Sequence, residues 1–176
     1  RGLGDVYKRQ LWTDKPAADI ERAVFLPEQY TGLDSTAKIA EITSALGMDQ
    51  DDALVFSSPE SIAWLLNVRG RDIPFVPIVQ SFAVLYKNGT VDWFVDPAKI
   101  TDHLRSLLSP LVEIKSPDLL GVILDALGIQ KARVQLDMAL SPAWIYERLS
   151  AAGATVHAKE DPCLIRKACK NITERD

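Results

Sequence analysis

The chain has 176 residues, and 47% of them are hydrophobic, which is enough apolar material for one domain with a full core. Its formal net charge of −4 at pH 7 argues against the clustered lysine and arginine that nucleic acids and anionic membranes attract. No stretch approaches the roughly 18 consecutive apolar residues of a membrane-spanning helix. We therefore expect no nucleic-acid partner and no membrane partner.

The first segment of the chain, residues 1–33, lacks the periodicity of a helix or a strand. Residues 1–10 show no apolar period, and we expect them to be a non-native scar outside the fold. Residues 11–33 contain Pro16, Pro27 and many polar side chains. This composition is typical of an interdomain linker that runs over a surface.

The domain itself is predicted to occupy residues 34–160 and to begin with a helix. A cap at Asp34 or Ser35 predicts a helix over residues 36–46, with glycine as its stop. Residues 53–56 form a short, fully apolar run after an acidic turn. That pattern is typical of a buried strand.

Residues 57–85 hold the densest apolar run and the least ordinary local sequence. A hydroxyl cap, a proline in the first turn and an acid over residues 57–60 predict a helix start. The turn NVRG at residues 67–70 is expected to end this helix. The two prolines in residues 71–77 exclude a helix there, and a strand-like pattern follows over residues 79–87.

The next part of the sequence predicts a β-hairpin, residues 82–87 and 91–95 joined by Asn88 and Gly89. Asn-Gly between apolar runs is the strongest short-range hairpin signal, because both residues tolerate positive φ. Strands and helices then alternate, so the fold class is α/β: a mixed sheet with an antiparallel hairpin and βα units, flanked by helices. The predicted helices run from Asp96 to Leu108, Ser116 to Gly128 and Ser141 to Ala152, and the strands over residues 111–115, 133–137 and 155–158.

The last segment, residues 161–176, is predicted to open a helix that carries both cysteines. Cys163 and Cys169 are six positions apart and point in different directions on a helix, so we expect no disulfide between them. Residues 1–20 are polar and charged and show no secretory signal. We therefore expect a reducing, cytoplasmic location.

A search for catalytic or metal-binding residues finds no self-contained active site. His103 and His157 lie in different predicted elements and match no metal-binding motif, so we interpret them as surface or edge residues. Cys163 and Cys169 lack the spacing of zinc ligands and are expected to be core thiols. The acidic run at residues 49–52 is interpreted as a solvated turn.

Arg69, Arg71 and Asp72 form the one charged group that invites two interpretations. In the plain interpretation, Asp72 pairs with an arginine on the surface. In the functional one, Arg69 is held by a helix end and a rigid loop and faces a partner domain or an anionic ligand. The planar guanidinium group suits carboxylate recognition.

The stretch SIAWLLNVRGRDIPFVP (residues 61–77), followed by SFAVL, an Asn-Gly turn and FVDPAKI, resembles the middle domain of three-domain Xaa-Pro aminopeptidases. These enzymes (aminopeptidase P, M24 metallopeptidase family) usually read SIAWLLNIRGSDIPYNPV there. LWTDKP at residues 11–16 is similar to the segment that leaves their first domain. DPCLIRKACKN at residues 161–171 is similar to the helix that leads into their catalytic domain. Arg71 replaces the common serine, and Phe75 with Val76 replaces a Tyr-Asn pair.

The resemblance implies a creatinase/prolidase N-terminal fold for residues 34–160 and a lead-in helix in residues 161–176. It also implies a parent enzyme that removes an N-terminal residue preceding proline, with two divalent metal ions, manganese as a rule. Two Asp, one His and two Glu of a following pita-bread domain hold those ions. None of these positions falls in this chain, so we assign it no catalytic residue and no metal ligand.

We therefore expect a non-catalytic middle domain, inactive alone, that helps to frame the active-site cleft. Its partners would be the first and catalytic domains of the same protein and a peptide with proline in second position, and the resemblance leaves a homodimeric parent open. Arg69 and Asp72 are the candidate contacts with another domain or with the substrate cleft. The alternative is a stand-alone α/β module that shares the fold and binds a small molecule or a protein.

Overall fold

A computed structural model describes residues 20–48, 50–108, 110–170 and 175 of the chain. The expected scar at residues 1–10, the first part of the expected linker and Asp49 lie outside the described residues. The limits proposed for the domain therefore stay predictions.

A six-stranded mixed sheet forms the centre of the molecule, in the order β6-β5-β4-β2-β7-β8. Strand β4 is antiparallel to both of its neighbours, whereas the pairs β2/β7, β7/β8 and β5/β6 are parallel. This arrangement confirms the predicted combination of a hairpin with βα units. The strands are β2 (Ala53–Phe56), β4 (Phe82–Tyr86), β5 (Val91–Phe94), β6 (Val112–Lys115), β7 (Arg133–Leu136) and β8 (Thr155–Ala158).

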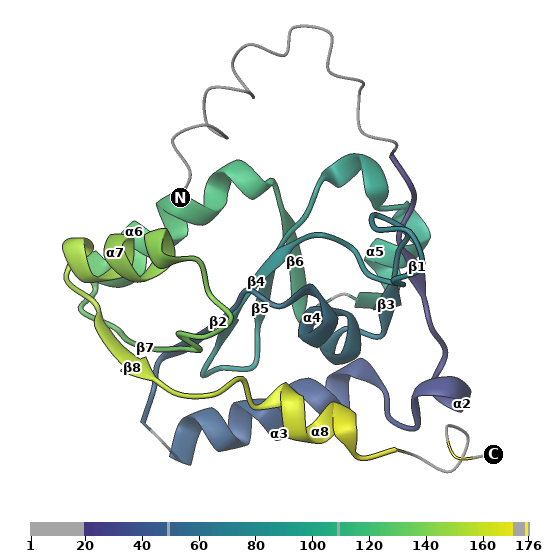
Figure 1. Cartoon of the computed structure of the whole chain (residues 1–176), viewed down its shortest axis with the longest axis horizontal. Helices are drawn as coiled ribbons and strands as arrows, with labels where there is room; N and C mark the ends of the chain where they lie inside the picture. The colour runs from purple at the N-terminus through teal and green to yellow at the C-terminus, as the bar shows by residue number, and fades with distance from the viewer. Residues whose placement is uncertain (1–19, 49, 109, 171–174, 176) are drawn as a thin grey trace, which may run out of the picture.

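Helices cover both faces of the sheet (Figure 1), with α6 and α7 on one side and α3, α4, α5 and α8 on the other. A separate two-stranded ribbon pairs β1 (Val24–Phe25) with β3 (Val68–Arg69). The helices are α2 (Glu28–Thr31), α3 (Ser35–Met48), α4 (Pro59–Leu65), α5 (Asp102–Leu108), α6 (Leu120–Ile129), α7 (Ala143–Ala152) and α8 (Cys163–Ala168), with 3-10 turns at Pro97–Lys99 and Pro117–Leu119.

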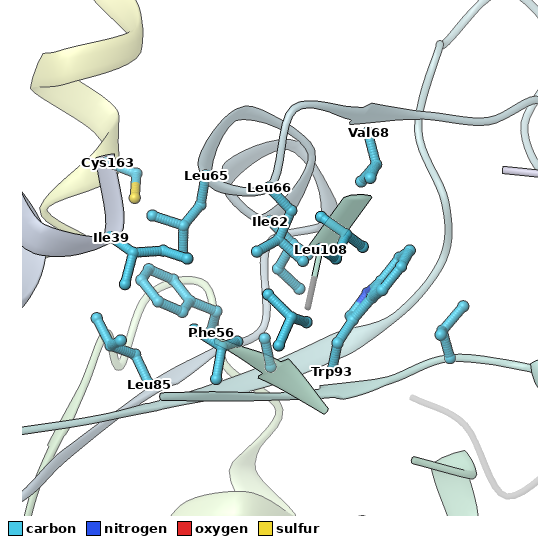
Figure 2. Packing of buried hydrophobic residues seen from close by; sticks show 14 of the residues in the cluster. Ile39, Phe56, Ile62, Leu65, Leu66, Val68, Leu85, Trp93, Leu108 and Cys163 are labelled. Atoms are coloured by element: carbon cyan, nitrogen blue, oxygen red, sulfur yellow. The ribbon is translucent and has the colours of Figure 1, made fainter. Parts of the chain in front are cut away.

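Alternate residues of the central strands supply two cores, because successive side chains of a strand point to opposite faces. Leu54 and Phe56 of β2 join the core under α3, α4 and α8, whereas Val55 joins the core under α6 and α7. Figure 2 shows the first core, in which Phe56 and Trp93 rise from the sheet toward the helices. The buried Cys163 belongs to this core, so α8 packs on the same body as α3 and α4.

The predicted helix from Asp96 to Leu108 is wrong, because the structure breaks it into two pieces. The Asp96 carboxylate accepts a hydrogen bond from the Ala98 backbone N–H at 2.9 Å and caps a single 3-10 turn. The chain is extended at Ile100, and the Thr101 hydroxyl then accepts from the Leu104 N–H at 3.1 Å to cap α5. A second capping residue thus restarts the helix.

Two glycines do not end helices as predicted. Helix α3 continues through Gly47 to Met48, and α6 continues through Gly128 to Ile129. Gly128 is buried where α6 crosses α7, and a Cβ atom there would lie 2.2 Å from the Ala152 Cβ. This glycine permits close packing of two helices, which a sequence pattern alone does not distinguish from a stop signal.

The acidic turn and the cysteines also differ from expectation. The Asp51 side chain is fully buried, with its carboxylate 3.0 Å from His157 Nδ1 and 3.4 Å from Arg133 Nε. It therefore joins β7 and β8 to the start of β2 instead of facing solvent. Both cysteines are free, but only Cys163 is a core thiol, because Cys169 is exposed.

Candidate functional site: the hollow beside the proline loop

The end of helix α4 is fixed by a polar network that reaches back to α3. Asn67 adopts a left-handed backbone with φ of 53°, and its Nδ2 donates to the Leu33 carbonyl at 2.8 Å. The buried Lys38 donates to Asn67 Oδ1 at 2.6 Å and to the Trp64 carbonyl at 3.0 Å. These contacts determine the direction in which the chain leaves α4.

Arg69 follows this junction and holds the last turn of α4. Its Nη1 donates to the Ala63 carbonyl at 2.8 Å and to the Val68 carbonyl at 2.9 Å. Carbonyl groups at the C-terminal end of a helix lack intrahelical donors. The Arg69 guanidinium supplies such a donor to the Ala63 carbonyl. The side chain is half-exposed, so the same residue also reaches the surface.

Asp72 closes the base of the loop over residues 72–80, which we call the proline loop. Its side chain is only 5% exposed, and Oδ2 accepts from Lys99 Nζ and from the Gln80 backbone N–H, both at 2.6 Å. The expectation that Asp72 pairs with a surface arginine is therefore wrong. Lys99 comes from the 3-10 turn after β5 and lies within reach only because the fold brings the two segments together.

The tip of the loop is a tight turn with an exposed aromatic residue. The Val76 N–H donates to the Ile73 carbonyl at 3.1 Å, with Pro74 and Phe75 between them. Phe75 has φ of 66°, and its side chain is fully exposed. A positive φ costs a residue other than glycine about 1–2 kcal/mol. The surrounding contacts thus hold Phe75 in a strained backbone that presents its ring to solvent.

A hollow of about 880 Å³ lies between this loop and the ribbon β1/β3. Exposed apolar side chains dominate its walls, and Arg22, Arg69 and Arg71 supply positive charge against a single acid, Glu21, among the described lining residues. The apolar lining residues are Ile20, Val24, Ile73, Pro74, Phe75, Val76 and Pro77.

One wall of the hollow comes from the segment that the sequence predicted to be a linker. Val24 pairs with Arg69 in the ribbon, and the Ala23 N–H donates to the Lys99 carbonyl at 2.9 Å. Sequence reasoning missed this strand. Its only signal was the apolar run at residues 23–26 between Arg22 and Pro27, which is shorter than a usual strand.

The described residues offer no metal centre. They contain no group of three or more His, Cys, Asp or Glu side chains placed to hold a metal ion. The two-ion site implied by the resemblance thus has no fitting ligands in the part of the chain that the structure describes. No helix in that part is long and apolar enough to cross a membrane.

Comparison with known families decides the relationship. The creatinase/prolidase N-terminal domain model matches residues 14–174. The chain belongs to this family. The hollow is therefore a feature of a creatinase/prolidase N-terminal domain.

Two curated relatives of this creatinase/prolidase N-terminal domain are named as Xaa-Pro aminopeptidases, in line with the resemblance. "Probable Xaa-Pro aminopeptidase P" of Aspergillus niger is 32% identical over 169 residues, which cover 92% of this chain and 27% of the relative. Xaa-Pro aminopeptidase 1 of Dictyostelium discoideum is 33% identical over 150 residues, 85% of this chain and 23% of the relative. The chain thus spans about a quarter of the length of these relatives.

Solved structures agree with the family. The X-prolyl aminopeptidase of Caenorhabditis elegans, described as a cytosolic enzyme with a di-nuclear active site, gives a TM-score of 0.84 at 25% identity, covering 95% of this chain and 28% of that one. The Streptococcus thermophilus aminopeptidase P structure gives a TM-score of 0.52 at 18% identity, covering 72% of this chain and 92% of that one. This likeness shows a shared fold.

Proposed function

We propose that the chain is the non-catalytic middle domain of a metal-dependent Xaa-Pro aminopeptidase, an enzyme that removes an N-terminal residue preceding proline. One observation carries the proposal. The X-prolyl aminopeptidase of Caenorhabditis elegans matches 95% of this chain, but the match takes up only 28% of that enzyme. A peptidase several times longer therefore contains a domain with this fold.

In this proposal the domain supplies a rigid wall of the active-site cleft and no chemical group for peptide-bond cleavage. The buried Asp72–Lys99 pair and the hydrogen bonds of Arg69 hold the proline loop in one shape. A wall of fixed shape limits access to the cleft and favours short peptides. Arg69, which lines the hollow, and Asp72, which positions the loop, are the proposed contacts with the cleft or with another domain.

The metal ions belong to another domain of the proposed parent enzyme. Support comes from the di-nuclear site named for the Caenorhabditis elegans enzyme and from the lack of a ligand cluster among the described residues here. We propose two divalent ions, manganese as the first choice, and a cytoplasmic location like that named for the same enzyme.

The reading frame that encodes the chain tests this proposal. We expect it to continue into a segment that carries two Asp, one His and two Glu as the ligands of the two ions. A complete frame without that set would exclude the peptidase and favour the alternative, a stand-alone binding module with the same fold. Sequencing the complete transcript gives the answer.

A further inference from the structure

We propose that the hollow binds the downstream part of a peptide substrate and prefers an acidic residue there, with Arg22 and Arg71 pairing with its carboxylate. The inference rests on the proposed function, because it names the peptide as a substrate. A substrate preference of the longer enzyme would then depend on residues of this domain.

Charge is the first argument for an acidic ligand. Arg22 and Arg71 are exposed, line the same hollow and form no ion pair with any residue in the described part of the chain. Glu21 is the one acidic residue of the described lining, and the nearby carboxylate of Asp72, outside that lining, is already engaged by Lys99. The hollow is thus locally cationic on a chain whose net charge is −4. Guanidinium groups bind carboxylates through paired hydrogen bonds.

The apolar walls are the second argument, because they suit the apolar side chains of a peptide. Ile73, Phe75 and Val76 from the loop face solvent together with Ile20 and Val24 from the opposite side. Phe75 is fully exposed, at 105% of the reference accessible surface of the residue. Adjacent apolar and cationic surfaces suit a peptide that alternates apolar and acidic side chains.

Rigidity is the third argument, because a fixed surface loses little entropy when it binds a ligand. Gly70 lets β3 lie against the loop so closely that a Cβ atom there would come within 2.6 Å of Val79 Cγ2. The Asp72–Lys99 pair and the hydrogen bond between Val76 and Ile73 hold the rest of the loop in place. The strained conformation of Phe75 is therefore set before any ligand arrives.

Titration of the isotope-labelled chain with three peptides, followed by NMR, tests the preference directly. The probes are Ala-Pro-Ala-Glu-Leu-Ala and its versions with Gln or Lys in place of Glu. We expect shifts at residues 20–24 and 69–77, and about three- to tenfold tighter binding of the Glu peptide than of the Gln peptide. The preference should shrink as salt is raised, because exposed charges are screened.

Matched variants separate the charge from the apolar surface. Arg22→Gln and Arg71→Gln should each reduce the preference for Glu, whereas Arg105→Gln, an exposed arginine on α5 outside the hollow, should leave it unchanged. Phe75→Asn should weaken the binding of all three peptides alike and leave the ratio between their affinities unchanged. Because these side chains are exposed, the thermal midpoint of each variant should stay near that of the parent chain.

Three results would overturn the inference: no shifts at millimolar peptide, equal affinity for the three peptides, or shifts outside the hollow. A fourth concerns the longer enzyme. If Arg71→Gln leaves its relative kcat/KM for the Glu and Gln peptides unchanged, the substrate assignment is wrong. None of these results affects the reading-frame test, so failure of the preference and failure of the proposed function are distinguishable.

Discussion

At the scale of single residues, the Asp72 carboxylate shows how one buried charge shapes the proline loop. Its side chain is 5% exposed, and that of its partner Lys99 is 14% exposed. Each of these charges stabilises the other, because a charge that is shielded from water and has no partner destabilises the folded state.

We expect Asp72→Asn to lower the free energy of unfolding by about 1–3 kcal/mol, since the amide keeps an acceptor but leaves Lys99 without a counter-charge. Urea unfolding monitored by circular dichroism measures the loss. The double variant Asp72→Asn with Lys99→Met should recover part of it.

The exposed Asp125–Arg148 pair is the matched control for this prediction. Its side chains are 42% and 44% exposed, so water screens their interaction. Asp125→Asn should therefore change the stability very little. If Asp72→Asn lowered the free energy of unfolding as little as Asp125→Asn, the Asp72–Lys99 pair would not hold the loop.

At the scale of secondary-structure elements, the packing of α6 on α7 depends on one glycine. A Cβ atom at Gly128 would lie 2.2 Å from the Ala152 Cβ and 2.7 Å from the Ala152 carbonyl carbon, so the helices would have to separate. We expect Gly128→Ala to destabilise the chain by about 2–3 kcal/mol, the upper part of the range for overpacked cores. The midpoint of urea unfolding measures the change.

Gly121 on the same helix provides the control. The atoms nearest to a Cβ atom there belong to the guanidinium end of the exposed Arg148 side chain, which can move aside. Gly121→Ala should therefore be neutral or should stabilise the chain by up to about 1 kcal/mol, because alanine favours a helix over glycine. Equal losses of stability for Gly128→Ala and Gly121→Ala would contradict the close helix crossing at Gly128.

Asp52 links three strands and gives the chain one source of acid sensitivity. A hydrogen bond from Lys87 and a second one from the Arg133 backbone N–H hold the pKa of Asp52 below its usual value. A lowered folded-state pKa gives stability that is present above the unfolded pKa and lost as pH falls through the folded one.

The stability difference between the parent chain and Asp52→Asn should therefore exist at pH 7 and shrink below about pH 4. Urea unfolding at pH 7, 5 and 3 measures it. A difference that stays constant or grows in acid would mean that the Asp52 charge does not stabilise the fold.

The sequence predicted those elements whose signals are local. The cap at Asp34, the Asn-Gly hairpin and the alternation of strands and helices all appear in the structure. Short and non-local features were missed. The ribbon strand β1 has only two residues, and Asp51 is buried by partners from β7 and β8 that only the folded chain assembles.

At the candidate site, local sequence signals located the loop but not its contacts. The rigid proline loop with Arg69 and Asp72 could be located from Gly70 and the two prolines. The pairing of Asp72 with Lys99 could not, because the two residues are 27 positions apart in the sequence. No pattern in a single sequence indicates such a pair.

At the scale of the whole molecule, the chain is a folded creatinase/prolidase N-terminal domain with a shaped surface and, among its described residues, no metal-ligand cluster. The proposal assigns the chemistry of Xaa-Pro cleavage to another domain of a longer protein. The activity of the domain and that of the longer protein should therefore differ completely.

Release of the N-terminal alanine from an Ala-Pro-Ala peptide, with manganese present, tests this central claim most directly. The purified 176-residue chain should release none, and the full product of the gene that encodes it should release alanine under the same conditions. Cleavage by the purified chain, or a metal-loaded full product that leaves the peptide intact, would contradict the account.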